Sequence, residues 1–285
     1  MRFAFATSAV WPRLTVGDAL CALAVEQRGH VVEPAVWDDE QVEWSSFDAV
    51  VIRSCWDYHR KHRAFLAWLR NLEAAGLRVL NDVGSISWNS DKRYLVELRE
   101  RGVPVVESVL IEDGLVSRTA LRSLTTDRLV VKPAISASSD GVEVVNVETL
   151  PISRPYALLV QPFLAEIANG EKSIVVFDGA ISHAVLKSPA AGEFRVQADY
   201  GGSAEECRVE DDERLLAEQL LGLIDPVPLY ARVDVVRTDS GPLLMELELI
   251  EPELFVHVVP ESATRFAEAL ERQTSRDEQL RQREK

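Results

Sequence analysis

The chain has 285 residues, of which 47% are hydrophobic and 27% are charged, so its composition is that of a folded globular protein and excludes a disordered or collagen-like chain. A chain of this length accommodates about two domains. Its net charge of −15 argues against binding to nucleic acids or anionic membranes, because both need a basic protein surface.

The first ninety residues predict a small α/β lobe with a largely parallel sheet. Short apolar runs alternate with segments of helical spacing, and Gly29 and Gly76 follow the two helical segments as stop signals. The predicted strands are residues 3–7, 31–36, 49–52 and 77–80, and the predicted helices are residues 16–28 and 64–75.

Residues 91–163 predict a smaller α+β lobe. It begins with a helix over 91–101, for which Ser90 or Asp91 is the capping residue and Gly102 the stop. We expect strands at residues 129–131, 142–147 and 157–160, and a helix near residues 119–124.

Residues 164–285 predict a third, strand-rich lobe that ends in a charged helix. A turn-forming cluster, Thr238–Pro242, joins two apolar strands into a hairpin over residues 230–236 and 243–249. The other predicted elements are strands at 173–177, 180–186 and 194–197 and helices at 213–223 and 261–285. We therefore expect domain boundaries that give segments 1–90, 91–163 and 164–285.

The hairpin carries a candidate metal site. Side chains alternate along a strand, so Glu246 and Glu248 share one face, and Asp234 on the preceding strand can face them. Carboxylates side by side repel one another, and a divalent cation with hard oxygen ligands, such as Mg²⁺, removes that repulsion. A solvated face of an edge strand is the alternative interpretation of the same pattern.

A candidate phosphate site follows the apolar run 129–131. Lys132 ends that run, and the loop behind it contains Ser136, Ser138, Ser139 and Gly141. Hydroxyls and backbone N–H groups of such a loop can bind phosphate oxygens, and the lysine adds a positive charge. The same residues also suit a strand end with a flexible hairpin loop, and the pattern is not a Walker A loop.

Taken in order, these pieces resemble the ATP-grasp superfamily, especially its glutathione synthetase-like members. The matching motifs are Asp91-Lys92, Lys132-Pro133 with the loop to Gly141, Gln161–Leu164, Gly170–Ser173, Phe194-Arg195, Arg232–Asp234 and Glu246–Glu248. The segments Arg53–His59, Trp88–Lys92 and Glu246–Pro252 look like the small ATP-grasp ligases of the O-ureido-serine cyclo-ligase type. The resemblance implies an ATP-grasp fold preceded by a Rossmann-like lobe.

The resemblance also implies roles for individual residues. Lys92 and Lys132 match lysines that hold ATP phosphates, and the serines of the loop match the lid over them. The remaining matches are Gln161, Phe163 and Leu164 at the adenine, Glu171 at the ribose, Asp234, Glu246 and Glu248 at two Mg²⁺ ions, and Arg195, with Lys187 assisting, at the transferred phosphoryl group. Two departures from the family pattern are a lid with few glycines and Glu248 where an asparagine is common.

A second polar cluster follows the predicted strand 49–52. Ligands of open α/β sheets bind beyond the carboxyl ends of strands, so Arg53, Asp57 and Tyr58 are candidates for substrate contacts. A capped loop in which Asp57 pairs with Arg53 is the alternative. Gly201 and Gly202 follow Arg195 closely, and they suit either an acceptor site or a simple turn.

These features predict an ATP-dependent ligase that activates a carboxylate as an acyl phosphate and joins it to an amine. The substrate is a small amino-acid-like molecule, and ring closure within one molecule and ligation of two amino acids or peptides both fit. An ATP-grasp kinase and a non-catalytic nucleotide-binding protein are alternatives of other classes. Three widely spaced cysteines and the lack of an apolar stretch of 18 residues indicate a soluble, cytoplasmic protein, and a homodimer is the commonest state for such chains.

Overall fold

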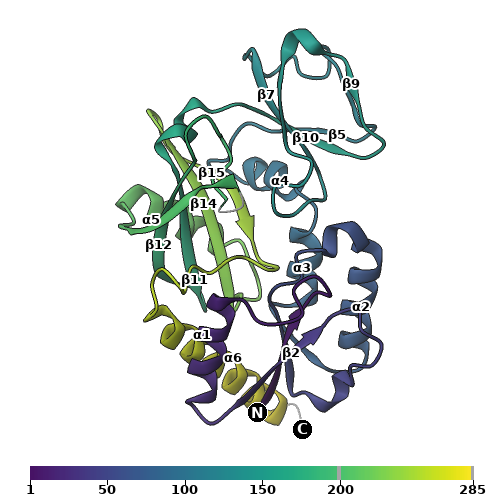
Figure 1. Ribbon diagram of the computed structural model, residues 1–285, viewed down its shortest axis with the longest axis vertical. Coiled ribbons are helices and arrows are strands. Elements are labelled where there is room, and N and C mark those ends of the chain that lie inside the picture. Colours follow the sequence, from purple (N-terminus) through teal and green to yellow (C-terminus); the bar gives the residue numbers. More distant parts are fainter. Residues whose placement is uncertain (198–199, 284–285) are drawn as a thin grey trace.

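Three main β-sheets follow one another along the chain in the computed structural model, which describes residues 1–197 and 200–283 (Figure 1). The first and the last segment of the chain lie together at one end of the molecule, and the second sheet lies at the other end. None of the described helices is long and apolar enough to cross a membrane.

The N-terminal sheet is parallel throughout and has the order β2-β1-β3-β4. Every residue of β3 is buried, as expected of a strand covered on both faces. This confirms the predicted α/β lobe. Its elements are β1 (Arg2–Thr7), α1 (Val16–Glu26), β2 (Val31–Val36), β3 (Ala49–Ile52), α2 (His62–Ala74) and β4 (Arg78–Leu80).

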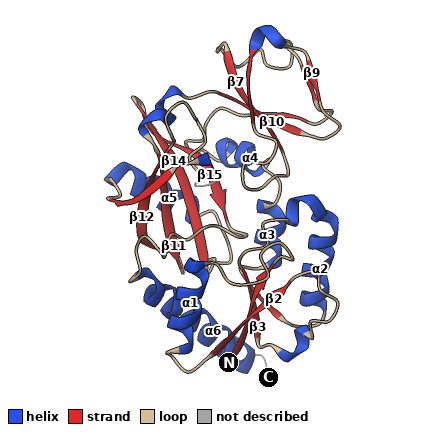
Figure 2. Ribbon diagram, in the orientation of Figure 1, coloured by secondary structure: helices blue, strands red, loops and turns tan. Residues whose placement is uncertain are grey.

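The second sheet is antiparallel, with the order β5-β10-β7-β8. Two short helices, α3 (Val83–Asn89) and α4 (Tyr94–Glu100), precede it, and Figure 2 shows them between the first and second sheets. The strands are β5 (Val109–Ile111), β7 (Arg128–Pro133), β8 (Glu143–Asn146) and β10 (Leu158–Pro162), and β6 (Leu115–Val116) pairs with β9 (Ile152–Ser153).

One prediction for this region is wrong, and one helix was not predicted. Residues 119–124 form turns rather than a helix, with only Leu121 buried among them, so little packing supports a helical conformation. Helix α3 was not predicted, because Gly84, Ser85 and Ser87 interrupt the apolar spacing. The Asp82 side chain caps this helix by accepting a hydrogen bond from the Ser85 N–H at 3.0 Å.

The third sheet is antiparallel and has the order β13-β12-β11-β14-β15. The hairpin of β14 and β15 confirms the prediction from the sequence. The predicted strand at 194–197 does not form, and the edge strand is β13 instead, which pairs with β12. The elements are β11 (Glu171–Phe177), β12 (Ala180–Ser188), β13 (Ser203–Cys207), α5 (Asp211–Leu221), β14 (Tyr230–Thr238), β15 (Gly241–Glu248) and α6 (Ser262–Arg283).

Helix α6 joins the first and third sheets. Phe266 makes edge-to-face contacts with Phe5 of β1, at 6.1 Å between ring centroids, and with Phe177 of β11, at 5.5 Å. All three rings are buried in one apolar cluster that also includes α1 residues. The C-terminal helix therefore completes the core under the N-terminal sheet.

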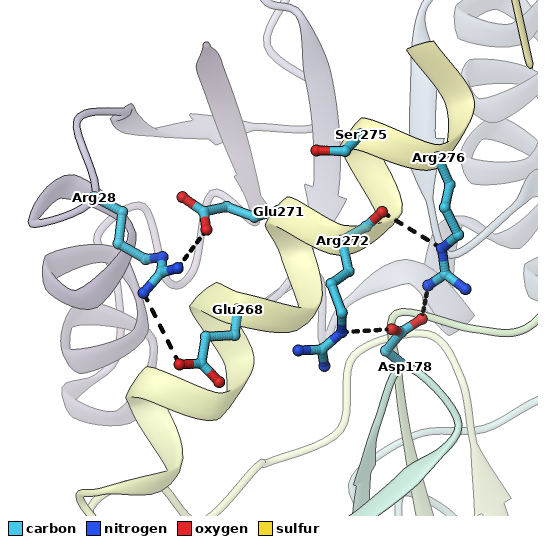
Figure 3. Close-up of a pocket in the computed structure, with 7 residues that line it drawn as sticks. All are labelled: Arg28, Asp178, Glu268, Glu271, Arg272, Ser275 and Arg276. Atoms are coloured by element: carbon cyan, nitrogen blue, oxygen red, sulfur yellow. Dashed lines mark hydrogen bonds and ion pairs between the residues drawn. The ribbon is translucent and has the colours of Figure 1, made fainter. Parts of the chain in front are cut away.

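A hollow of about 610 Å³ lies at the surface of this junction (Figure 3). Asp178 binds Arg272, at 2.9 Å, and Arg276, while Arg28 binds Glu271 at 2.5 Å. Figure 3 shows these charges directed at one another across the helix surface. Because they neutralise one another, we assign this hollow a structural role.

Candidate functional site

The three predicted metal carboxylates come together on the β14–β15 hairpin. The register places Asp234 opposite Glu246 and Arg232 opposite Glu248. A β-bulge follows Asp234 and shifts the pairing by one residue. Asp234 is buried, with 2% of its surface exposed, so this face is not the solvated strand face of the alternative interpretation.

Side chains from the preceding segment hold β15 in place. β15 is an edge strand of the third sheet, and among the described residues its outer side is paired only through a single bridge between Val105 and Leu244. Asn89 donates to Leu247 O and accepts from Leu249 N, each at 2.8 Å, and the Tyr94 hydroxyl bonds both the O and N of Leu247. Asn81 Nδ2 donates to Leu249 O at 2.7 Å. These groups replace a neighbouring strand and thereby fix the direction of the Glu246 and Glu248 side chains.

Each of the three carboxylates has a cationic partner. Lys92 Nζ lies 2.7 Å from Glu246 Oε1, and Arg232 bonds both Asp234, at 2.9 Å, and Glu248. Lys187 Nζ lies 3.3 Å from Asp234. Arg232 was not among the predicted site residues, although the sequence signal was present: it alternates with Asp234 on the same strand face.

The same groups shift one another's pKa. Burial raises the pKa of Glu248 to about 7; Arg232 opposes this effect, and the Glu246 and Asp234 carboxylates add to it. Burial acts in the same direction on Asp234, but Arg232 and Lys187 outweigh it and hold the pKa of Asp234 below its usual range. Negative charge is therefore in excess around Glu248.

These residues fit Mg²⁺ by the chemistry of their donors. Within the described ranges, no three His, Cys, Asp or Glu side chains are already arranged to hold a metal ion, because Asp234, Glu246 and Glu248 point at cations. Carboxylate oxygens are nevertheless the ligands that Mg²⁺ prefers, and a divalent ion would offset the charge excess at Glu248. The three carboxylates can hold the ion once they exchange their present partners.

The two predicted phosphate lysines lie beside this cluster. Both lysines are buried. Burial lowers the pKa of Lys132; the positive charge of Lys92 acts in the same direction, and the carboxylates of Glu246 and Glu171 oppose it. Lys92 Nζ also donates to Ser136 O at 2.9 Å, and the Lys92 N–H donates to Ala134 O at 2.7 Å. The loop that follows Lys132 therefore starts directly at the lysine pair.

The rest of this loop reaches the N-terminal lobe. Ser138 and Ser139 have positive φ angles of 52° and 58°, so the chain turns sharply there. The Asp140 carboxylate lies 3.1 Å from His59 Nε2 and 3.1 Å from Arg60 Nη2. The loop is thus fastened at its tip to the 3₁₀ helix η2 (Tyr58–Lys61).

The predicted nucleotide hinge lies at the end of β10. Gln161 is buried and its amide donates to Ser108 Oγ at 2.8 Å, so its side chain points into the protein. The guanidinium carbon of Arg128 lies over the Phe163 ring, 4.0 Å from the ring centroid. Leu164 begins the turn into the 3₁₀ helix η4 (Ala165–Asn169), and Glu171 pairs with Lys187 at 2.5 Å.

Arg195 lies apart from the carboxylate cluster. Its partners among the described residues are Glu193, at 2.7 Å, and the rings of Phe194 and Tyr200, all from its own segment. Gly202 packs so closely that a Cβ there would lie 2.1 Å from Val196 O, and the Gly201 φ is +81°. Both glycines are therefore needed for a tight turn next to Arg195.

The polar cluster of the N-terminal lobe does not form the capped loop in which Asp57 pairs with Arg53. Asp57 does not pair with Arg53; it accepts from Trp37 Nε1 at 2.9 Å. Arg53, 3% exposed, binds Asp18 at 2.7 Å and Pro252 O at 2.8 Å, and its Nη1 is buried without a hydrogen-bond partner in the described structure. Tyr58 packs against Phe65, with ring centroids 5.1 Å apart.

Two family models match this chain. Residues 3–81 match the N-terminal domain of D-cycloserine synthetase DcsG, and residues 130–256 match the ATP-grasp domain of prokaryotic glutathione synthetase.

Two individual proteins are similar to this chain as well. The chain is 29% identical over 268 residues to the cycloserine biosynthesis protein DcsG of Streptomyces lavendulae, which covers 85% of this chain and 88% of that protein. It is also 29% identical over 189 residues to a probable alpha-L-glutamate ligase of Parasynechococcus marenigrum (strain WH8102), covering 62% of this chain and 40% of that ligase.

Two solved structures extend the comparison. The crystal structure of D-cycloserine synthetase DcsG superposes with a TM-score of 0.82 at 28% identity and covers 95% of this chain and 98% of that one. A D-alanine–D-alanine ligase from Bacillus anthracis has a TM-score of 0.67 at 17% identity over the whole of both chains, which shows a shared fold.

Proposed function

We propose that this chain, whose residues 130–256 match the ATP-grasp domain of prokaryotic glutathione synthetase, is an ATP-dependent carboxylate–amine ligase that closes a ring within one small amino-acid-derived substrate. The observation that carries the proposal is the similarity to D-cycloserine synthetase, because it extends over 95% of the chain and includes the N-terminal lobe. Substrates of open α/β sheets bind at the ends of such strands, so similarity there bears on the substrate.

ATP is the cosubstrate, and the two lysines are proposed to bind its phosphates. Lys92 and Lys132 are buried beside the carboxylate cluster, where their charge is little screened. The loop serines Ser136, Ser138 and Ser139 would cover the phosphates. Gln161, Phe163 and Leu164 would meet the adenine, largely through the backbone, because the Gln161 side chain points inward. Glu171 would reach the ribose after releasing Lys187.

We propose that two Mg²⁺ ions are held by Asp234, Glu246 and Glu248. The metal supplies neutralisation and orientation of the ATP phosphates. For the ions to bind, Lys92 and Arg232 must leave the carboxylates, and phosphate oxygens are the natural new partners for both cations. Nucleotide and metal binding would in this way exchange one set of ion pairs for another.

Two steps then make the C–N bond. The substrate carboxylate attacks the terminal phosphorus of ATP, which releases ADP and forms an acyl phosphate. An amine of the same molecule attacks the acyl carbon and phosphate leaves. Arg195, with Lys187, is proposed to stabilise the charge on the phosphoryl group. We add Arg232 to these two, because it is a permanent cation among the metal carboxylates.

The proposed substrate side comprises Arg53, Asp57, Tyr58 and the turn at Gly201 and Gly202. Arg53 retains one buried nitrogen without a partner among the described residues, which suits a substrate carboxylate. In this proposal residues 1–90 form the substrate lobe, 91–163 carry the phosphate lid and 164–285 carry the metal site. We expect a homodimer, which light scattering after gel filtration would test.

The test is mass spectrometry of the protein with Mg²⁺, ATP and the two enantiomers of O-ureidoserine, with hydroxylamine in a parallel tube. ADP together with a trapped hydroxamate supports acyl-phosphate chemistry, and a cyclic product formed from one substrate molecule supports ring closure. ADP without hydroxamate but with a stable phosphorylated acceptor would indicate a kinase. Nucleotide binding without any ADP would indicate a non-catalytic protein.

Ligation of two molecules is the second candidate. It is supported by the similarity to the probable alpha-L-glutamate ligase, which covers residues of both ATP-grasp lobes. Adding single amino acids pairwise to the same assay tests it, because a product heavier than either amino acid would replace the cyclic one.

A further inference from the structure

Glu251 occupies the point where the chain passes from the metal strand to the N-terminal lobe. It lies three residues after Glu248, and its backbone oxygen accepts a hydrogen bond from Trp56 Nε1 at 3.0 Å. The next carbonyl, of Pro252, accepts from Arg53 Nη2 at 2.8 Å. The backbone at Glu251 is thus held between the ATP-binding half and the proposed substrate lobe.

The Glu251 side chain has no partner. Glu251 is 8% exposed, and no hydrogen bond or ion pair reaches its carboxylate from residues 1–197 or 200–283. Neither carboxylate oxygen of Glu251 is among the fully buried polar atoms that lack a hydrogen-bond partner, so both oxygens are still accessible to solvent. A buried carboxylate without a partner is costly, and it is stable only where a ligand or water compensates.

This sets Glu251 apart from the other acids of the site. Asp234, Glu246 and Glu248 each bind a lysine or an arginine. Lys92 and Arg232 are near enough to act electrostatically on Glu251, yet neither bonds it. Burial, and after it the Glu248 carboxylate, raise the pKa of Glu251 well above its usual range.

Groups of the opposite character belong to the segment that holds this backbone. Arg53, which bonds Pro252 O, has its Nη1 buried, and Ser8 has its Oγ buried; in the part of the chain described neither atom has a hydrogen-bond partner. Ser8 follows β1 and Arg53 follows β3, and these two strands are neighbours in the parallel sheet. Hydrogen-bond donors together with an unpaired carboxylate are the complement of a zwitterion.

We infer that Glu251 binds the ammonium group of the substrate, so that the enzyme selects a molecule with a free amino group beside the carboxylate that it activates. This inference deepens the proposed function and rests on it. The ammonium supplies the cation that Glu251 lacks, and Arg53 with Ser8 can hold the other end of the same molecule once their buried atoms become accessible to it. Glu251 is therefore a specificity residue, distinct from the metal ligands.

Binding measurements test this independently of turnover. Calorimetry in the presence of Mg²⁺ and a non-hydrolysable ATP analogue compares O-ureidoserine, D-alanine and L-glutamate with their counterparts that lack the α-amino group. For the wild type we expect at least one amino acid to bind about 30-fold or more tightly than its counterpart, as expected for a desolvated charge pair. In Glu251→Gln we expect that preference to fall below about threefold.

Two further variants control for misfolding and for charge. Glu251→Asp keeps the carboxylate and should retain most of the preference. Glu253→Gln is the matched control, because the Glu253 carboxylate already accepts from the Phe255 N–H at 3.0 Å and should leave the preference unchanged. Nucleotide-induced thermal stabilisation equal to that of the wild type shows that each variant is folded with an intact ATP site.

Several results would overturn the inference. Wild-type protein that binds none of the amino acids, or binds them no better than their counterparts, excludes an ammonium site. An unchanged preference in Glu251→Gln does the same. A shifted Mg²⁺ dependence in Glu251→Gln with an unchanged preference would instead make Glu251 a metal ligand. Failure of the hydroxamate assay with normal amino-acid preference would refute the proposed ligase activity while leaving the ammonium site standing.

Discussion

The side chain of Asn89 offers a direct test of how the metal strand is positioned. Asn89 is 6% exposed and makes two hydrogen bonds of 2.8 Å to the buried backbone groups of Leu247 and Leu249. Asn89→Ala removes both bonds and leaves the buried Leu249 N–H without a partner, whereas Leu247 O keeps its hydrogen bond from the Tyr94 hydroxyl. The unsatisfied N–H costs about 1–3 kcal/mol and the lost bond to Leu247 O about 1 kcal/mol, so we expect the free energy of unfolding to fall by about 2–4 kcal/mol.

The measurement is urea denaturation followed by tryptophan fluorescence and circular dichroism, with coincident transitions required before a free energy is taken from it. Asn71→Ala is the control, because Asn71 is exposed on α2 and should change stability by less than about 0.5 kcal/mol. We also expect a higher KM for Mg²⁺-ATP in Asn89→Ala, because a displaced β15 moves Glu246. A loss below about 1 kcal/mol with normal KM would refute the role given to Asn89.

Three further predictions concern the site and its surroundings. Glu246→Gln should lower Mg²⁺-dependent ADP formation at least about 100-fold, since it removes a proposed metal ligand; unchanged turnover would show that the metal assignment is wrong. Burial lowers the pKa of His183 to about 4, so its contribution to stability is complete above about pH 6.5 and is lost as the pH falls toward 4. That loss amounts to about 3 kcal/mol, and chemical denaturation at a series of pH values should show a flatter profile for His183→Gln. Asp140→Asn should release the lid tip from His59 and accelerate proteolytic cleavage within residues 136–141; equal cleavage rates in Asp140→Asn and the wild type would argue against this contact.

Local patterns in the sequence were sufficient for much of the fold. The hairpin over residues 230–249 was predictable because a turn cluster separates two apolar runs, and alternation along the strand put Glu246 and Glu248 on one face. The parallel N-terminal sheet followed from apolar runs alternating with helical segments. The hairpin prediction uses information from residues 230–249 alone, and the sheet prediction uses the succession of local patterns along the first ninety residues.

Partners that are distant in the chain could not be predicted in this way. The charge environment of Asp234 depends on Lys187, and Glu246 pairs with Lys92, which belongs to a segment far away in the chain. The edge of the third sheet is β13 rather than residues 194–197, because pairing with β12 outweighs the local preference of an alternating apolar and polar segment.

The sequence by itself therefore determined which chemical groups the site contains, because residue type and alternation fix donors, charges and the face of a strand. The tertiary structure alone decided how those groups are paired. It satisfies the outer edge of β15 with Asn81, Asn89 and Tyr94, and it leaves Glu251 buried without a partner among the residues that the structure describes. The physical reason is that hydrogen bonds and ion pairs between segments more than a hundred residues apart depend on packing, which no local pattern encodes.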